Sequence, residues 1–297
     1  MSKYTVLYNP KAGNGSAETE TRKLDEILAG SEIRYIDITG IKSYAELFSS
    51  MDKDAKLVIS GGDGTLNRFV NDTEGEELPE RIYYFATGTG NDFLLDIGKT
   101  REDGVIDITE YLKDLPTVTV NGKSFRFINA IGFGIDGYCC EVGDKLREKS
   151  DKRVDYTGIA IKGLLFHFKP TNAEVTVDGV KHSYKKVWIA PTMHGRYYGG
   201  GMKTAPEQNR LDRDSGDSFA VMYGKGRLRT LIMFPSIFKG EHVRYTDSVE
   251  IIRGHNITVR FDRPTALQID GETILNVSEY SVKTARAAEI KEAPAVR

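Results

Sequence analysis

The sequence has little of the residue types that mark the more specialised classes of protein. Its 297 residues include two cysteines, one tryptophan and nine prolines. The 41 Lys and Arg residues nearly balance the 43 Asp and Glu residues, so the formal net charge is −2. Because a protein that binds the phosphate backbone of nucleic acid needs a clear excess of Lys and Arg, we expect no nucleic acid partner.

Other absences bear on the compartment. Cys139 and Cys140 are adjacent, a spacing that suits neither an ordinary disulfide nor a CxxC motif. The first residues lack the basic region and apolar core of a signal peptide. The apolar stretch over residues 228–238 is broken by polar residues and falls well short of the roughly 20 apolar residues that span a bilayer. We expect a cytoplasmic protein that contacts membranes peripherally.

The order of strand-like and helix-like segments predicts two domains. Short β-favouring runs at residues 4–8, 33–38, 56–60 and 82–85 alternate with helical patterns at 16–29, at 44–51 and from 66 onward. This alternation is typical of a parallel sheet covered by helices. We predict an α/β domain over residues 1–116, with the tail from about 279 to 297 as a candidate to pack back onto it.

After about residue 115 the pattern changes to short strands and tight turns. Asn121-Gly122 separates two β-favouring runs, and Asp178-Gly179 separates two more. Further strand-like runs follow at 219–223, 249–252, 257–261 and 266–269, while residues 141–168 read as helical. We predict an antiparallel β-sandwich domain over residues 117–278.

A glycine-rich turn follows the predicted strand 56–60. Its residues are Gly61-Gly62-Asp63-Gly64-Thr65. Glycines at a strand end let backbone N–H groups approach a phosphate, and the start of a helix adds its positive dipole end. Asp63 would repel a bare phosphate, so it favours a nucleotide that carries Mg²⁺. A tight turn in which Asp63 caps the next helix is the alternative.

Two more glycine turns follow the first and fourth predicted strands. They are Asn9-Pro10-Lys11-Ala12-Gly13 and Gly88-Thr89-Gly90-Asn91-Asp92. The carboxyl ends of parallel strands meet at one edge of the sheet, where ligands bind in such folds. Three turns at one edge therefore predict a nucleotide site.

Two other glycine motifs are poor candidates. Gly122-Lys123-Ser124 resembles the end of a phosphate-binding loop, but an Asn-Gly hairpin turn explains it better. The GxGxxG match over residues 132–137 stands in the β-rich half instead of opening a βαβ unit. The five histidines show no metal-ligand spacing.

Two carboxylates flank a glycine near the end of the chain, at Asp270-Gly271-Glu272. A hairpin turn with an exposed Glu272 is one interpretation. A carboxylate that accepts the proton of an attacking hydroxyl group during phosphoryl transfer is the other. The spacing alone favours the turn.

Taken together, the motifs resemble the diacylglycerol kinase catalytic family, specifically its soluble bacterial lipid kinases. GGDG alone also occurs in NAD kinases and phosphofructokinases, so the combination and its order carry the resemblance. In chain order the motifs are Asn9-Pro10-x-Ala12-Gly13, GGDGT at 61–65 with Asn67, GTGND at 88–92, Gly132-x-Gly134-x-Asp136, Gly199-Gly200-Gly201 leading to Ala205-Pro206, Gly240-Glu241-His242, and Asp270-Gly271-Glu272.

The resemblance implies a Rossmann-like nucleotide-binding domain of the NAD kinase and phosphofructokinase kind, followed by a β-sandwich. ATP with Mg²⁺ would bind in a cleft, and a lipid hydroxyl would be the acceptor. Glu272 would accept the proton, with Asp270 as its acidic neighbour and Asp63 as a further catalytic carboxylate. The implied nucleotide-site residues are Asn9, Pro10, Lys11, Ala12, Gly13, Thr39, Gly61, Gly62, Asp63, Gly64, Thr65, Asn67 and Thr89.

One departure from the family pattern concerns a structural Mg²⁺. The family carries an Asp-Gly shortly after the Ala-Pro of the glycine-rich run, and that Asp helps to organise the ion. Here Ser215-Gly216 stands at the best-aligned place. Asp212 and Asp214 are the candidate substitutes as metal ligands.

We therefore predict an ATP-dependent lipid kinase that meets a lipid such as diacylglycerol at a membrane surface. Two alternatives stay open: a kinase of the same superfold that acts on a soluble substrate such as NAD, and a non-catalytic nucleotide-binding regulator. The sequence does not fix the oligomeric state, and a homodimer is one candidate.

Overall fold

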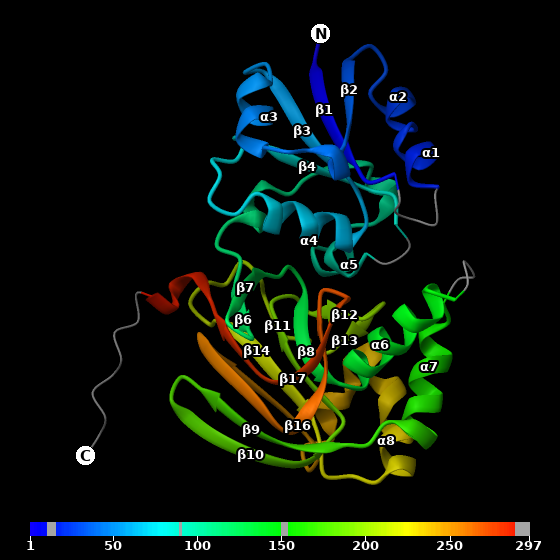
Figure 1. The fold of residues 1–297 in the computed structure, drawn as a ribbon, viewed down its shortest axis with the longest axis vertical. Helices are drawn as coiled ribbons and strands as arrows, with labels where there is room; N and C mark the ends of the chain where they lie inside the picture. Colours follow the sequence, from blue (N-terminus) through cyan, green and yellow to red (C-terminus); the bar gives the residue numbers. More distant parts are fainter. Residues whose placement is uncertain (11–15, 89–90, 150–153, 289–297) are drawn as a thin grey trace. The chain divides into compact units, whose positions relative to one another are not determined.

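The computed structural model describes residues 1–10, 16–88, 91–149 and 154–288 (Figure 1). The chain forms two compact units, Met1–Lys113 and Asp114–Arg297. The first unit is a parallel-sheet α/β fold and the second is built on an antiparallel sheet. The predicted fold class is confirmed.

The first unit contains a five-stranded sheet in the order β2-β1-β3-β4-β5. The strands β1 (Lys3–Tyr8), β2 (Glu32–Asp37), β3 (Ala55–Gly61) and β4 (Ile82–Ala86) are parallel. Continuous buried runs in β1 and β3 mean that both faces of the sheet are covered. The sequence did not predict β5 (Val105–Asp107), which runs antiparallel to β4 and is too short to carry a hydrophobic pattern.

Short helices connect these strands. The predicted helix over residues 16–29 is two helices, because the chain turns at Arg22 and Lys23 between them. The threonines of the first half are weak helix formers. The connections are α1 (Ala17–Thr21), α2 (Leu24–Ile27), η2 (Ile38–Gly40), α3 (Tyr44–Ser50), α4 (Asp63–Asp72), α5 (Asp92–Asp96), η3 (Arg101–Asp103) and η4 (Thr109–Leu112).

The second unit is one continuous antiparallel sheet that folds around its own core. Its order is β15-β14-β11-β8-β16-β17-β6-β7, and β9 joins β10 to β16. The predicted strands 257–261 and 266–269 are the two ends of the single strand β16 (Asn256–Ile269). Its first half pairs with β9 and its last residues pair with β8, with register shifts between them. β16 therefore belongs to both layers of the predicted sandwich.

The remaining strands fit around β16. The sequence did not predict β8 and β17, whose buried and exposed residues alternate poorly. The Asn121-Gly122 turn joins β6 and β7, as expected. The strands are β6 (Thr117–Val120), β7 (Lys123–Arg126), β8 (Ala130–Gly134), β9 (Thr171–Val177), β10 (Val180–Val187), β11 (Ile189–Met193), β12 (Tyr197–Tyr198), β13 (Met202–Lys203), β14 (Asp217–Met222), β15 (Val249–Gly254) and β17 (Glu272–Lys283).

Helices pack against this sheet. α6 (Ile135–Arg147) begins directly after β8, so the GxGxxG match straddles a strand end and a helix start outside any βαβ unit. Cys139 and Cys140 lie on α6 as free thiols. The other helical segments are α7 (Tyr156–Lys162), η5 (Gly163–His167), α8 (Arg227–Met233), η6 (Phe234–Lys239), η7 (Glu241–Arg244) and η8 (Ala285–Ala288).

Residues 279–283 of the tail, the candidate to pack back onto the first domain, belong to the antiparallel sheet of the second unit. These residues are the end of β17 and pair with β16 and β6. Alternate side chains on that strand face the core of the second unit, where Tyr280 and Val282 are buried. Residues 289–297 lie outside the described part of the chain.

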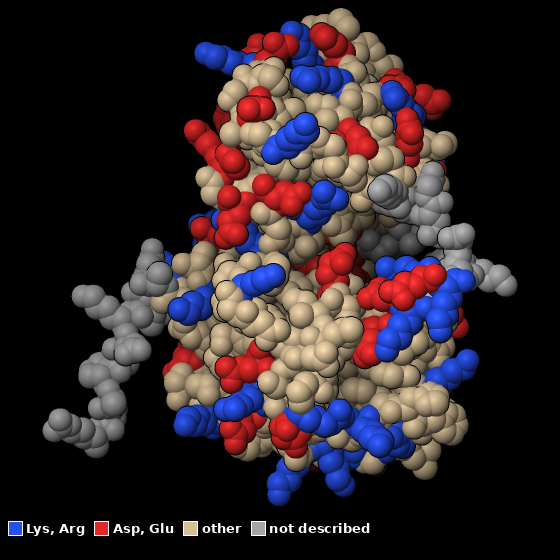
Figure 2. Space-filling model, viewed as in Figure 1, with Lys and Arg blue, Asp and Glu red and all other residues tan. Residues whose placement is uncertain are grey.

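Charges of both signs are mixed over the face drawn in Figure 2. Across the described residues, no helix is long and apolar enough to cross a bilayer.

Gly137 lies at a close contact between α6 and the backbone of β16. A Cβ atom there would lie 2.2 Å from the carbonyl oxygen of Ala266. We expect Gly137→Ala to lower the free energy of unfolding by about 1–3 kcal/mol, although alanine favours helix, because backbone must move to accommodate it. Chemical denaturation measures this effect. Gly40→Ala, with open space around its Cβ, is the control, and equal losses in both variants would contradict the packing argument.

Candidate functional site

The described parts of the predicted nucleotide turns lie at one edge of the sheet in the first unit. Tyr8 of β1 is in register with Asp37 of β2 and with Ser60 of β3, and Ser60 is in register with Phe85 of β4. The residues that follow these four therefore leave the sheet at one level. Since the strands are parallel, this level is their common carboxyl edge, where ligands of such sheets bind.

The GGDG turn is shaped by its contact with α4. A Cβ atom on Gly61 would lie 2.4 Å from the Cβ of Thr65, so no larger residue fits there. The carbonyl oxygen of Gly61 accepts hydrogen bonds from the Tyr84 hydroxyl at 3.0 Å and the Thr87 N–H at 2.9 Å. Gly64, in the first turn of α4, has open space around it. The turn is thus fixed on its strand side and open at the start of the helix.

Asp63 joins two of the glycine turns. Its Oδ2 accepts hydrogen bonds from the backbone N–H groups of Asp92, at 2.8 Å, and Phe93, at 3.4 Å. Asp63 therefore caps α5, whereas the alternative considered from sequence had it capping the helix that follows it, α4. Asp63 is the first residue of α4 itself. A carboxylate at two helix N-termini is favoured by both helix dipoles.

The other predicted nucleotide residues are distributed along the same edge. Thr39 follows β2, and both its N–H and its hydroxyl donate to Asp37 Oδ1 at 2.7 Å. Asn67 is buried on α4 and accepts from Asn71. Asn9 and Pro10 follow β1 and are half-buried. Four further predicted residues lie outside the described residues: Lys11, Ala12, Gly13 and Thr89.

Sequence reasoning missed Arg101 at this edge. Its Nε donates to the carbonyl oxygen of Ala86 at the end of β4, at 3.2 Å, and its guanidinium lies 3.0 Å from the Glu20 carboxylate. A cation at the carboxyl edge could stabilise phosphate charge. Its position in a separate 3-10 turn gave no motif that would have revealed it.

In the second unit, Asp270-Gly271 is the turn between β16 and β17. Asp270 and Gly271 have φ angles of 45° and 93°, and Ile269 pairs with Glu272 across the hairpin. The hairpin turn is therefore confirmed, and the role of Glu272 as proton acceptor stays a prediction. A left-handed conformation at a residue other than glycine costs roughly 1–2 kcal/mol, so something must hold Asp270 in place.

Three backbone N–H groups hold the Asp270 carboxylate. Ile128 donates to Oδ2 at 2.6 Å, while Asn129 and Ala130 donate to Oδ1 at 2.8 Å and 2.9 Å. Asp270 N–H in turn donates to the Ala130 carbonyl oxygen at 2.9 Å. Hydrogen bonds to a charged group contribute about 1.5–3 kcal/mol each, which outweighs the strain. This carboxylate is engaged by the backbone, so it suits positioning better than proton transfer.

Glu272 is placed differently from Asp270. It is the first residue of β17 and its side chain is exposed. Gly271, between the two carboxylates, donates its N–H to the side-chain oxygen of Gln268 at 2.9 Å. The turn thus has two side-chain supports, Asp270 and Gln268, and it presents Glu272 beside them.

Asp136 is a further carboxyl group of the second unit, and it was not among the predicted site residues. It lies in the first turn of α6 and is buried. Burial raises the pKa of Asp136 to about 6, and nearby backbone N–H groups, Gln268 and Tyr198 act in the opposite direction. Neither Gln268 nor Tyr198 forms a hydrogen bond of normal geometry with it. The signal in the sequence was an Asp two residues after the Gly-x-Gly at the end of a strand.

Comparison with known proteins agrees with this geometry. Residues 3–118 match the diacylglycerol kinase catalytic domain. Residues 129–286 match the domain described as the YegS C-terminal NAD kinase beta sandwich-like domain. The chain belongs to the diacylglycerol kinase-like family.

Relatives in this kinase family span nearly the whole chain. A diacylglycerol kinase of Mycobacterium tuberculosis strain H37Rv is 26% identical over 270 residues, which cover 87% of this chain and 85% of the relative. A diacylglycerol kinase of Bacillus subtilis strain 168 is 25% identical and covers 92% and 90%. A crystal structure of a diacylglycerol kinase from Bacillus anthracis strain Sterne has a TM-score of 0.63, with 19% identity and coverage of 95% and 94%, and so shares the fold. Membership in a kinase family implies the use of ATP.

The structural Mg²⁺ implied by the diacylglycerol kinase resemblance does not fit the residues present here. The Asp212 carboxylate accepts hydrogen bonds from Ser215 Oγ, at 2.6 Å, and from the N–H of Asp214, at 3.1 Å. The exposed Asp214 carboxylate pairs with Arg286. Mg²⁺ needs an octahedral set of oxygens, and no group of three His, Cys, Asp or Glu side chains within the described residues could hold a metal.

The buried Asp136 gives this kinase-family member a predicted pH dependence. A pKa of about 6 instead of 3.8 means that, between these pH values, the folded state keeps a proton that the unfolded chain has lost. The free energy of unfolding therefore falls as the pH rises through this window, by about 3 kcal/mol at most. Asp136→Asn removes this loss.

The measurement is urea denaturation of the wild type and Asp136→Asn from about pH 4 to pH 7. We expect the variant to gain stability relative to the wild type toward pH 7 and to match it more closely near pH 4. Tyr198, Tyr280, Cys139 and Cys140 surround the carboxyl group and stay neutral throughout. Parallel curves for the two proteins would contradict the assignment.

Proposed function

We propose that the protein transfers the γ-phosphoryl group of ATP to a hydroxyl group of a lipid such as diacylglycerol. The observation that carries this proposal is the β16–β17 turn, in which a fully engaged Asp270 fixes the backbone beside an exposed Glu272. A general base must be accessible to its substrate, and it must be held rigidly in position. Asp270 is therefore a positioning residue, and Glu272 is the candidate proton acceptor.

The first unit would hold the nucleotide. Its carboxyl edge combines the open start of α4 with the described residues that directly follow β1, β3 and β4. Backbone N–H groups and a helix N-terminus suit phosphate oxygens. Mg²⁺ would arrive with ATP as part of the substrate and neutralise charge on the phosphates.

The proposed reaction makes one bond, breaks one bond and moves one proton. The lipid hydroxyl oxygen attacks the γ-phosphorus, the bond to the β-phosphate oxygen breaks, and ADP leaves. The hydroxyl proton moves to a Glu272 carboxylate oxygen. Since phosphoryl transfer is catalysed mainly by positioning, the rigidity of the turn matters as much as the basicity of Glu272.

Glu272→Gln tests this role. The amide cannot accept the proton, so we expect kcat for phosphorylation of diacylglycerol in mixed micelles to fall by about 10²–10⁴-fold. Because Glu272 is exposed, the thermal unfolding midpoint should stay close to that of the wild type.

The matched control is Glu279→Gln. Glu279 lies on the same strand and forms an exposed ion pair with Arg260. It should retain the wild-type kcat. A Glu272→Gln variant as active as this control would rule out Glu272 as the base.

A membrane surface is the partner that we propose for the second unit. Phe166 on η5 and Leu228 and Ile232 on α8 are 69%, 71% and 66% exposed. The two elements are in contact, because Arg227 donates to the carbonyl oxygens of Gly163 and Leu164. Large apolar side chains at such exposure suit insertion into a lipid interface.

The charge around these residues favours anionic lipids. Residues 156–173 and 225–240 contain no Asp or Glu, and they carry exposed Lys162, Lys169, Arg229 and Lys239. Each cation near an anionic surface contributes about 1 kcal/mol. Figure 2 shows several Lys and Arg at the end of the second unit that carries α8 in Figure 1, with Asp and Glu also present toward β10. A local basic face thus coexists with a net charge of −2.

Part of the apolar run over residues 228–238 belongs to the core of the second unit. Met233, Phe234 and Ile237 are buried with Leu164 and Trp188. The helical period turns Leu228 and Ile232, four residues apart, to the outside.

Phe166→Asp combined with Ile232→Asp tests the membrane face. Both side chains are exposed, so the fold should persist, and we expect co-sedimentation with phosphatidylglycerol-containing vesicles to weaken by about tenfold or more. Ile27→Asp with Leu275→Asp places the same charges on exposed apolar positions of other elements and serves as the control. Unchanged vesicle binding of the first variant would reject this face.

A further inference from the structure

We call residues 128–130 the hub, because each of their backbone N–H and carbonyl groups forms a hydrogen bond. The three N–H groups hold Asp270, and the Ala130 carbonyl oxygen accepts from Asp270 N–H. The Asn129 carbonyl oxygen accepts from the N–H groups of His194 and Gly195 at 2.9 Å and 3.2 Å. The Ile128 carbonyl oxygen is the remaining group, and its partner is a cation.

That cation is Arg210. Its guanidinium donates to the Ile128 carbonyl oxygen at 3.1 Å and to the Asn129 side-chain oxygen at 3.2 Å. Arg210 is only 7% exposed, although it lies on a connection without regular structure. Burying a guanidinium is costly unless its donors are satisfied, and here the carbonyl oxygen of Ile128 and the side-chain oxygen of Asn129 accept from it.

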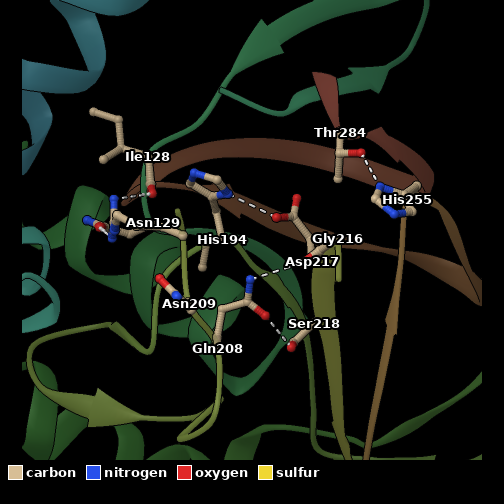
Figure 3. A network of polar contacts seen from close by, with 12 residues as sticks. Ile128, Asn129, His194, Gln208, Asn209, Gly216, Asp217, Ser218, His255 and Thr284 are labelled. Carbon is tan, nitrogen blue, oxygen red and sulfur yellow. Dashed lines mark hydrogen bonds and ion pairs between the residues drawn. The ribbon is translucent and has the colours of Figure 1, made fainter. Parts of the chain in front are cut away.

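The connection around Arg210 is itself firmly held. Gln208 donates to the Gly216 carbonyl oxygen at 3.0 Å and accepts from the Ser218 hydroxyl at 2.5 Å. His194, whose N–H holds the hub, lies 2.9 Å from Asp217 through its Nδ1. Figure 3 shows Ile128, Asn129, His194, Gln208 and Asp217 gathered in one network. Arg210 therefore reaches the hub from an anchored segment.

We propose that Arg210 takes over the structural role that the family resemblance assigns to a second Mg²⁺. The same connection that would supply metal ligands has its carboxylates, Asp212 and Asp214, engaged elsewhere. In their place, the connection directs the guanidinium of Arg210 toward the hub. A guanidinium is permanently charged and offers a planar fork of donors, so it can organise carbonyl oxygens as an ion would. It cannot dissociate.

The consequence for the proposed site is indirect. Arg210 fixes the hub, the hub holds Asp270, and Asp270 holds the turn that presents Glu272. Arg210 is therefore a positioning residue. The link from Arg210 to Glu272 rests on the proposed function. The claim that the fold needs no structural Mg²⁺ does not rest on it.

The first experiment measures thermal unfolding of the nucleotide-free full chain, after chelation, with and without millimolar Mg²⁺. A titration with Mn²⁺, followed by electron paramagnetic resonance, accompanies it. We expect an unchanged midpoint and no tight Mn²⁺ site. A saturable rise in the midpoint, or a tight Mn²⁺ site that Asp212→Asn or Asp214→Asn abolishes, would overturn the proposal.

The second experiment removes the cation. In Arg210→Gln we expect faster amide hydrogen exchange at residues 128–130. We also expect kcat to fall by about ten- to a hundredfold with KM for ATP unchanged, because the turn loses its fixed position. Arg210→Lys should recover part of kcat, since it keeps the charge but loses the fork.

Arg213→Gln is the matched control. Arg213 lies on the same connection and pairs with Asp114 at the surface, at 2.7 Å. Equal exchange rates in the Arg210 and Arg213 variants would overturn the proposal. If the wild type phosphorylates no lipid, the exchange and metal arms still decide the role of Arg210. The two failures are therefore distinguishable.

Discussion

The second unit depends on one interaction, the Asp270 carboxylate bound by three consecutive backbone N–H groups. The groups come from residues about 140 positions earlier in the chain, so the contact joins the start of β8 to the hairpin of β16 and β17. It stabilises a left-handed Asp at the tip of that hairpin. It also fixes the direction in which β17 begins, and so the place of Glu272.

The first unit uses the same device. Asp63 accepts N–H groups from the start of α5, as Asp270 accepts those of the hub. In both cases an acidic residue of a glycine-containing turn binds the backbone of a segment that is remote in sequence. Carboxylates that look catalytic by their spacing thus have structural duties, and the two turns become rigid. Rigidity at these turns is what phosphoryl transfer needs, because its catalysis is mostly positioning.

Local patterns predicted the features that are encoded locally. The parallel strands, the glycine turns at their carboxyl edge and the Asp270-Gly271 hairpin all follow from periodicity and turn chemistry. The partners of Asp63 and Asp270 do not, because nothing in a turn specifies which distant N–H groups will meet it. β5 was missed because three residues carry no period, and the helix at 16–29 was joined across a turn because its apolar spacing continued.

Arg210 is the clearest case of what sequence alone conceals. Gln208 and Arg210 are buried, while their neighbours Asn209 and Leu211 are exposed. Hydrophobic patterning predicts the opposite for Arg210 and Leu211, because it places apolar residues inside and charged residues outside. The missing Asp-Gly was visible as a departure from the family, but its compensation was not. Only the hydrogen bonds to the hub reveal that a cation is still supplied there.

The central claim is that these rigid turns serve phosphoryl transfer to a lipid hydroxyl. The most direct measurement offers ATP labelled at the γ-phosphate, with Mg²⁺, to a membrane lipid extract and, separately, to NAD, and identifies the labelled product by mass. The account predicts label in a chloroform-soluble phosphate monoester that wild-type protein forms from the extract. Label in NADP, or nucleotide binding without any labelled acceptor, would contradict it.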